Sequence, residues 1–117
     1  VRDRIGIKPL YYGQAGNEFV FASELKAFHQ HPRFKKEVNP SAVALLMRHN
    51  YIPAPYSIYQ GVKKLQPGML LEIPLGETTE ESCDQPIGSN CEPEAYWTLQ
   101  EAIANGKTNR YLYDWFY

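Results

Sequence analysis

The sequence has 117 residues, which is enough for one small domain with one hydrophobic core but leaves no room for two domains. Hydrophobic residues make up 44% and charged residues 21%, and twelve Lys and Arg against thirteen Asp and Glu leave a formal net charge of -1. This balance is that of a globular protein and gives no electrostatic reason to expect nucleic acid or an anionic membrane as a partner.

The N-terminal region carries no targeting signal. Near Val1 there is neither the apolar run of a signal peptide nor the stretch of about 18 apolar residues that a membrane helix needs. We therefore expect no membrane partner and a cytoplasmic location. Because the first residue is Val rather than Met, we expect a processed chain or a piece of a longer one. Cys83 and Cys91 lie in one polar loop, where two reduced thiols are favoured over a disulfide.

The first predicted elements form a hairpin. Residues 7–12 and 18–22 carry β-branched and aromatic side chains on either side of the turn formers at 14–17. Apolar side chains are nearly continuous in the second strand, which predicts that both of its faces are covered.

Two short helices are predicted next. Ser23 is in position to cap a helix of one or two turns, which ends before Pro32 because proline disfavours helical geometry at the residue before it. Asn39 and Pro40 suit the cap and first position of a second helix, whose apolar residues continue to about Arg48.

The second half of the chain alternates connections with short elements. Residues 51–59 are rich in proline and aromatic side chains and predict a stiff, extended and packed connection. Pro67-Gly68 predicts a tight turn before a strand at 69–73. Residues 76–94 are polar and predict a loop, and residues 100–104 a short helix that Gly106 stops.

No complete active site can be read from these residues. His29, His31 and His49 lack the further ligands of a metal site, and the two cysteines have no His or cationic run beside them that would lower a thiol pKa. The glycines near the N-terminus are not followed by the Lys-Ser or Lys-Thr pair of a phosphate-binding loop. We predict no catalytic, cofactor-binding or metal-binding residue on this chain.

A charged cluster at the N-terminus has a structural interpretation instead. Arg2 and Asp3, followed by Arg4, are predicted to make ion pairs that pin the hairpin to a neighbouring element.

Three blocks of sequence have to be read together. The first two are residues 2–13 (Arg-Asp-Arg-Ile-Gly-Ile-Lys-Pro-Leu-Tyr-Tyr-Gly) and 21–27 (Phe-Ala-Ser-Glu-Leu-Lys-Ala). The third comprises residues 51–55, 57–59 and 61–68 and leads to the pair Tyr96-Trp97. Together the blocks resemble the late glutaminase segment of class II glutamine amidotransferases and the connector that follows it in the asparagine synthetase-like family. The motif residues that we expect to hold structure are Arg2, Asp3, Gly6, Pro9, Gly13, Ser23, Glu24, Lys26, Pro67 and Gly68.

The resemblance implies an α+β fold in which the chain forms an incomplete part of an N-terminal nucleophile hydrolase sandwich, with two sheets between helices (αββα). It divides the chain into residues 1–75, the C-terminal part of the glutaminase domain, and residues 76–117, a loop and connector toward a synthetase domain. Enzymes of this family release ammonia from glutamine with an amino-terminal cysteine. The ammonia crosses an internal tunnel to a domain that activates aspartate with ATP and Mg²⁺.

The family's catalytic motifs cannot be placed on this sequence. The amino-terminal cysteine and the glutamine-binding segments are expected upstream of Val1, and the pyrophosphate loop downstream of Tyr117. Glutamine and aspartate are therefore expected as substrates of the parent enzyme, and ATP and Mg²⁺ in its synthetase domain. The isolated chain is expected neither to hydrolyse glutamine nor to bind ATP.

Two alternatives stay open at this point. The chain is compatible with a fragment of another class II amidotransferase that acts on a different carboxylate. It is also compatible with a non-catalytic interaction module that uses the aromatic tail at 105–117, which departs from the acidic helix expected there. The acceptor substrate and the parent's oligomeric state, a homodimer included, are not fixed by the sequence.

Overall fold

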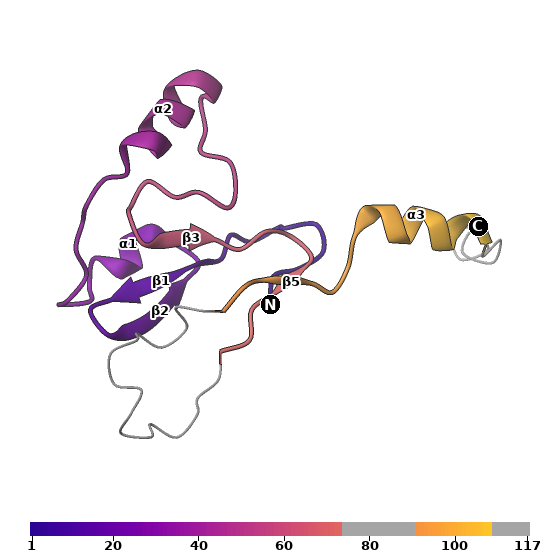
Figure 1. The fold of residues 1–117 in the computed structure, drawn as a ribbon, viewed down its shortest axis with the longest axis horizontal. Helices are drawn as coiled ribbons and strands as arrows, with labels where there is room; N and C mark the ends of the chain where they lie inside the picture. Colours follow the sequence, from indigo (N-terminus) through magenta and orange to yellow (C-terminus); the bar gives the residue numbers. More distant parts are fainter. Residues whose placement is uncertain (74–90, 109–117) are drawn as a thin grey trace.

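The computed structural model describes residues 1–73 and 91–108 and gives a mixed α+β fold with two small antiparallel sheets (Figure 1). The larger sheet has the strand order β2-β1-β3, and the smaller sheet pairs β4 with β5. Within the described ranges no helix is long and apolar enough to cross a membrane. The strands are β1 (Tyr11–Ala15), β2 (Glu18–Ala22), β3 (Val62–Lys64), β4 (Met69–Leu70) and β5 (Glu94–Ala95), and the helices are α1 (Leu25–Phe28), α2 (Pro40–His49) and α3 (Leu99–Thr108).

The predicted hairpin is confirmed, with one strand displaced. Strand β2 covers the predicted residues, but β1 begins at Tyr11 rather than at residue 7 and continues through Gln14 and Ala15, which were assigned to the turn. Strand pairing starts late because the Arg2 side chain and the Asp3 carboxylate already bind the backbone groups of residues 6–8. The turn itself is Gly16-Asn17, with Gly16 at a φ of 66° that glycine adopts readily.

Strand β3 joins the other edge of β1 and was not predicted. It has only three residues, and two of them are lysines, so no alternation of apolar and polar residues marks it. The pairing depends on Gly13, which lies opposite Val62. A Cβ atom at Gly13 would collide with the carbonyl oxygen of Gly61, so glycine allows the close approach of the two strands.

The core lies on one face of the larger sheet, under α1 and the loop that follows it. Its buried residues are Ala15, Phe28, Phe34 and Val62. The rings of Phe28 and Phe34 are 5.4 Å apart, and Phe34 meets Tyr59 edge to face at 5.5 Å. Tyr59 therefore anchors the 51–59 connection on this core, as the prediction of a packed connection requires.

Helix α1 starts later than predicted. Its N-cap residue is Glu24, with no side-chain capping hydrogen bond, and Ser23 is exposed. The predicted cap by Ser23 is therefore wrong. Glu24 pairs instead with Lys26, Oε2 to Nζ, at 2.7 Å in solvent. Such an exposed pair contributes little to stability.

Helix α2 begins as predicted. The Asn39 side chain accepts a hydrogen bond from the Ser41 N–H at 3.0 Å, and Pro40 is the first helical residue. The helix ends at His49, where Asn50 takes a left-handed conformation with a φ of 61°. Its apolar side stays largely open to solvent, with the Met47 side chain 78% exposed.

The C-terminal elements differ in length from the predictions. Strand β4 ends at Leu70 rather than at residue 73, and α3 runs from Leu99 to Thr108, through Gly106. The predicted stop at Gly106 is wrong, since a glycine inside a helix costs only about 1 kcal/mol relative to alanine. Most of the predicted 76–94 loop and residues 109–117 of the aromatic tail lie outside the described residues.

Candidate functional site

Arg2 connects three segments that are far apart in the sequence. Its Nε donates a hydrogen bond to the Lys8 carbonyl at 3.0 Å and its Nη2 to the Gly6 carbonyl at 3.1 Å, which closes the N-terminal loop. Its Nη1 donates to the carbonyl of Leu65. Hydrogen bonds from a charged donor are among the stronger ones in proteins, and here the planar guanidinium reaches three acceptors at once.

The backbone of Arg2 extends the same connection. Its N–H donates to the Met69 carbonyl at 2.9 Å, and its carbonyl accepts from the Tyr96 hydroxyl at 2.9 Å. The loop at residues 2–8, the turn at 65–69 and the segment at 95–98 are therefore held together by one residue. We refer to this arrangement as the Arg2 joint, which comprises Arg2, Asp3, Gly6, Leu65, Gly68, Met69 and Tyr96.

Asp3 holds the loop side of the Arg2 joint. Its carboxylate accepts a hydrogen bond from the Ile7 N–H at 2.8 Å, and its backbone carbonyl accepts from the N–H of Gly68 at 3.1 Å. The Ile7 N–H, the largest of several influences, holds the pKa of the exposed Asp3 carboxyl below its usual value because it stabilises the ionised form.

Gly68 lies where the turn meets the segment after β5. Its carbonyl accepts from the N–H groups of Tyr96, at 3.0 Å, and Trp97, at 3.3 Å. It has a φ of 72°, and a Cβ atom there would lie 2.5 Å from the Trp97 carbonyl oxygen. Both the backbone conformation and the contact therefore call for glycine at this position.

The predicted ion pairs of the N-terminal cluster are wrong. Arg2 and Asp3 bind backbone N–H and C=O groups, and Arg4 is exposed and makes no polar contact with the part of the chain that the structure describes. These two residues nevertheless join the loop that precedes the hairpin to the 65–69 turn. The charged side chains of Arg2 and Asp3 bind backbone groups, and these hydrogen bonds make the connection that ion pairs were predicted to make.

Five of the ten motif residues come together in space. Arg2, Asp3, Gly6, Pro67 and Gly68 converge, and a Cβ atom at Gly6 would lie 2.6 Å from Cγ of Pro67. The others lie elsewhere: Gly13 at the contact of β1 and β3, Ser23, Glu24 and Lys26 around the start of α1, and Pro9 in the stretch before β1.

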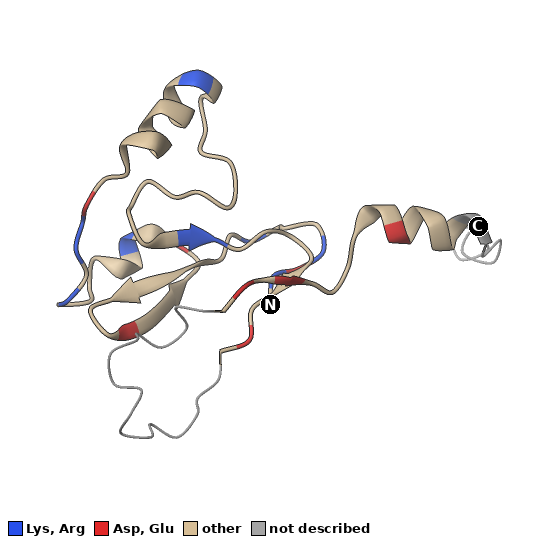
Figure 2. Cartoon of the chain, in the orientation of Figure 1, with Lys and Arg blue, Asp and Glu red and all other residues tan. Residues whose placement is uncertain are grey.

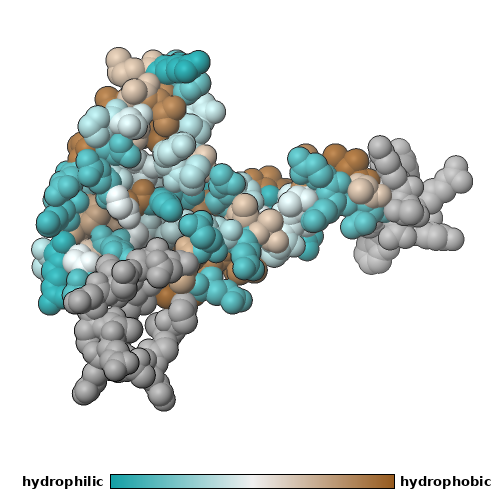
Figure 3. All heavy atoms as spheres, viewed as in Figure 1, coloured by the Kyte–Doolittle hydropathy of each residue, from teal (hydrophilic) through white to brown (hydrophobic). Residues whose placement is uncertain are grey.

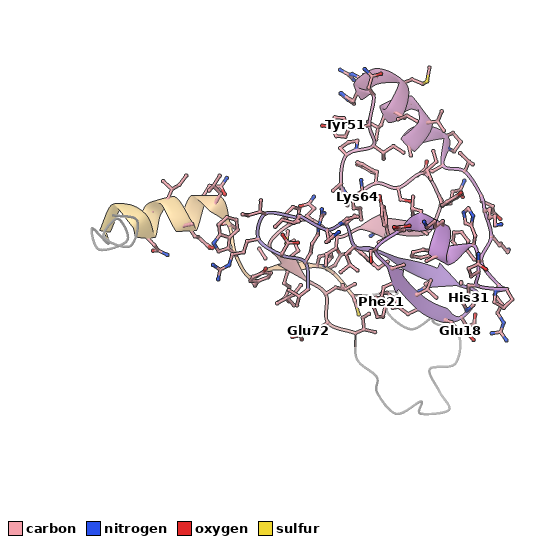
Figure 4. The ribbon with its side chains drawn as sticks, turned by 180° about the vertical axis from the view of Figure 1, so that it is seen from behind. Glu18, Phe21, His31, Tyr51, Lys64 and Glu72 are labelled. Carbon is pink, nitrogen blue, oxygen red and sulfur yellow. The ribbon has the colours of Figure 1, made fainter. Side chains whose placement is uncertain are left out.

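The three histidines are not brought together. His29 Nε2 is 2.8 Å from the Tyr59 hydroxyl, and His31 Nε2 is 2.6 Å from Glu18 Oε2 (Figure 4). The rings of His49 and Tyr51 lie 6.2 Å apart at the end of α2 and are tilted by 54°. In residues 1–73 and 91–108 no three His, Cys, Asp or Glu side chains are placed to hold a metal ion. Cys91 has a free thiol, and Cys83 lies outside the described residues.

Lys64 was not predicted as a site residue but is held next to the Arg2 joint. Its ammonium donates to the Ile52 carbonyl at 3.1 Å and lies 5.5 Å from the centre of the Tyr11 ring. Partial burial lowers the pKa of Lys64, and the positive charge of Arg2 lowers it further. Elsewhere basic and acidic residues are interspersed along the described chain (Figure 2).

The second face of the larger sheet is apolar and is open at Phe21, next to the half-buried Phe19 and the buried Tyr12. Tyr12 and Phe19 stack at 6.2 Å, and Phe19 contacts Phe21 at 6.5 Å. Phe21 is 71% exposed, so the prediction that both faces of β2 are covered is wrong for this chain. We call this surface the open sheet face; a hollow of about 370 Å³ on it is lined by Val1, Leu10, Tyr12, Phe19, Phe21, Leu65, Leu71 and Ile73.

Three members of the Arg2 joint were missed by sequence reasoning. Leu65 and Met69 take part through their backbone carbonyls, which no side-chain pattern can reveal, and Tyr96 takes part through its hydroxyl. Leu65 and Tyr96 nevertheless lie in the motif blocks quoted above, so for these two residues the blocks were the available signal.

Comparison of the sequence with known proteins found a matching family model and several similar curated proteins. A family model described as a glutamine amidotransferase domain matches residues 1–84. The chain is 46% identical over 67 residues to the putative asparagine synthetase [glutamine-hydrolyzing] 2 of Methanocaldococcus jannaschii, covering 56% of this chain. It is 32% identical over 108 residues to the asparagine synthetase [glutamine-hydrolyzing] 2 of Bacillus subtilis, covering 88% of this chain.

The chain spans only a small part of these relatives, 13% of the length of each. No solved structure matches the chain.

Proposed function

This chain belongs to the glutamine amidotransferase domain family, and we propose that it forms the late part of the glutaminase domain of a glutamine-dependent asparagine synthetase. The parent enzyme converts ATP, aspartate and glutamine into asparagine, glutamate, AMP and diphosphate. Residues 1–75 complete the glutaminase domain, and residues 76–117 lead toward the synthetase domain. We place the enzyme in the cytoplasm, where free thiols such as that of Cys91 persist.

The similarity to the Bacillus subtilis relative carries this proposal. It extends over 108 residues and 88% of the chain, whereas the family model ends at residue 84. A likeness limited to the glutaminase segment would fit any amidotransferase of the family. Continued similarity beyond it favours an enzyme in which a synthetase domain follows.

The open sheet face supports the four-layer sandwich as the complete architecture. One face of the larger sheet already carries α1 and the core around Phe28, and the other presents Phe21, which is 71% exposed, beside the half-buried Phe19. In the complete domain a second sheet packs on this face. Burial of an exposed phenylalanine such as Phe21 contributes about 2 kcal/mol, so covering the face stabilises the assembly.

In this proposal the chain supplies structure and other parts of the parent supply chemistry. The nucleophilic cysteine belongs to the first part of the glutaminase domain, and ATP and Mg²⁺ act in the synthetase domain. The residues of this chain position strands and connect the two catalytic domains.

A chimera tests the proposal. The aligned segment of the Bacillus subtilis relative is exchanged for this chain, and asparagine formation is measured with glutamine and, separately, with ammonia as nitrogen donor. We expect glutamine to support asparagine formation. Synthesis from free ammonia is the control, because it needs the synthetase domain but no glutaminase. A chimera that works with ammonia but releases no glutamate from glutamine overturns the proposal.

A further inference from the structure

The strongest unassigned feature is the way in which the Arg2 joint fixes the start of α3. Tyr96 is tied to Arg2 through its hydroxyl and to Gly68 through its N–H, and Leu99, the first residue of α3, follows after only two more residues. Thr98 caps the helix, since its hydroxyl oxygen accepts from the Glu101 N–H at 3.2 Å. These hydrogen bonds restrict the backbone torsion angles between the Arg2 joint and α3.

Helix α3 projects away from the larger sheet, and its apolar side is uncovered (Figures 1 and 3). Leu99 is 59% and Ile103 51% exposed, and Ile103 follows Leu99 by four positions, which places both on one side of the helix. The joint therefore holds in a set direction a helix whose apolar side is free to pack against something else.

We propose that Arg2 is a positioning residue: through the Arg2 joint it fixes the direction of α3 relative to the larger sheet and so keeps the glutaminase and synthetase domains aligned for ammonia transfer. This inference rests on the proposed function, with the synthetase domain of the same polypeptide as the partner that covers α3. Ammonia is small and neutral, and it escapes into water wherever the two domains do not meet closely.

Arginine is required for this role because of its geometry. Its three nitrogens reach the carbonyls of Gly6, Lys8 and Leu65 together, and they hold the loop and the turn in one arrangement. Lysine keeps the charge but has a single nitrogen that cannot reproduce this fork. Arg2→Lys and Tyr96→Phe therefore weaken the joint without placing a new charge or a larger side chain in it.

The first experiment measures the direction of α3 directly in this chain. Spin labels are placed at the exposed residues 63, on β3, and 101, on α3, with both natural cysteines changed to serine. Pulsed electron resonance then gives the distribution of distances between the labels. We expect a single narrow distribution that broadens in Arg2→Lys and in Tyr96→Phe. Arg4→Lys is the matched control, and it leaves the distribution unchanged. Unchanged distributions in both joint variants overturn the inference.

The second experiment measures coupling in the chimera described above. We expect Arg2→Lys to lower glutamine-dependent asparagine formation about tenfold, as small misalignments do. Glutamate release and synthesis from free ammonia stay close to those of the unsubstituted chimera, so the ratio of glutamate to asparagine rises. A ratio that does not change overturns the role in coupling.

The two proposals fail in different ways. An unsubstituted chimera that works with ammonia but not with glutamine overturns the proposed function and, with it, the role of the joint in coupling. If the chimera works with glutamine but the distances between the labels do not change in Arg2→Lys and Tyr96→Phe, only the inference about Arg2 is overturned.

Discussion

Replacement of Gly68 by alanine tests the Arg2 joint through its most crowded backbone position. The φ of 72° at Gly68 is left-handed, which costs an alanine about 1 to 2 kcal/mol. The added Cβ atom would also lie 2.5 Å from the Trp97 carbonyl oxygen, closer than such atoms approach, so the backbone has to move. Overpacking of this kind costs about 1 to 3 kcal/mol. The expected loss of unfolding free energy is therefore about 2 to 5 kcal/mol.

Gly61 offers a matched control within the same chain. Its φ is 71°, almost that of Gly68, but no atom lies within 4 Å of the position of a Cβ atom. Gly61→Ala therefore has the same backbone strain without the collision. The difference between the two variants isolates the contact with Trp97, and we expect it to be about 1 to 3 kcal/mol.

Urea denaturation followed by circular dichroism measures both losses, provided that the dependence on urea concentration has the same slope in all chains. If Gly61→Ala and Gly68→Ala lose the same free energy within about 0.5 kcal/mol, the close packing of the turn on the Trp97 segment is refuted.

Three further predictions concern other elements. Asn39→Ala should lower the unfolding free energy measured in urea by about 1 kcal/mol, because it leaves the Ser41 N–H without its cap. Asn39→Ser, which can still cap the helix, should lose less. Equal losses in the two variants contradict the cap. The pKa of Asp3 is lower in the folded chain than in the unfolded chain, where it is about 4. The contribution of Asp3 to folding stability is therefore complete above the unfolded pKa and is lost as pH falls through the folded pKa. Asp3→Asn should accordingly flatten the acid dependence of the urea midpoint. Parallel pH profiles of the two chains would refute this. Phe21→Ser should change the stability of this chain by less than about 0.5 kcal/mol, since Phe21 is 71% exposed. The same substitution should lower glutamine hydrolysis in the chimera. A large loss of stability in the chain alone contradicts an open sheet face.

Local signals in the sequence predicted the local elements well. Strand β2 and the start of α2 are set by neighbouring residues: aromatic and β-branched side chains in the strand, and Asn39 before Pro40 at the helix. Gly68 after Pro67 likewise marked a turn. In each case the residues that decide the structure lie within a few positions of one another, where intrinsic preferences act directly.

Partners far apart in the sequence were not predictable in the same way. The guanidinium of Arg2 binds carbonyls, and every residue has a carbonyl, so nothing in the composition identifies Leu65 as the acceptor. The start of β1 was misplaced for a local reason instead, because Ile7 has the side chain of a strand residue but its N–H is bound by Asp3, four positions earlier. The prediction that both faces of β2 are covered failed because an apolar strand indicates burial but does not indicate which segment of the protein covers it.

The glycines of the Arg2 joint explain why its charged residues need no charged partners. Gly6 has a φ of 75°, and its carbonyl accepts from the Arg2 guanidinium. A side chain at Gly6 would lie 3.0 Å from that guanidinium and 2.6 Å from Pro67, so any other residue would push the loop and the turn apart. Arginine, the glycine four positions later and the distant Pro67-Gly68 pair therefore form one structural unit, in which the glycines bring the carbonyls together and the arginine holds them. Since the unit joins the hairpin to the segment that leads into α3, a substitution at Gly6 should have the same consequence as one at Arg2, although the two residues share no chemistry.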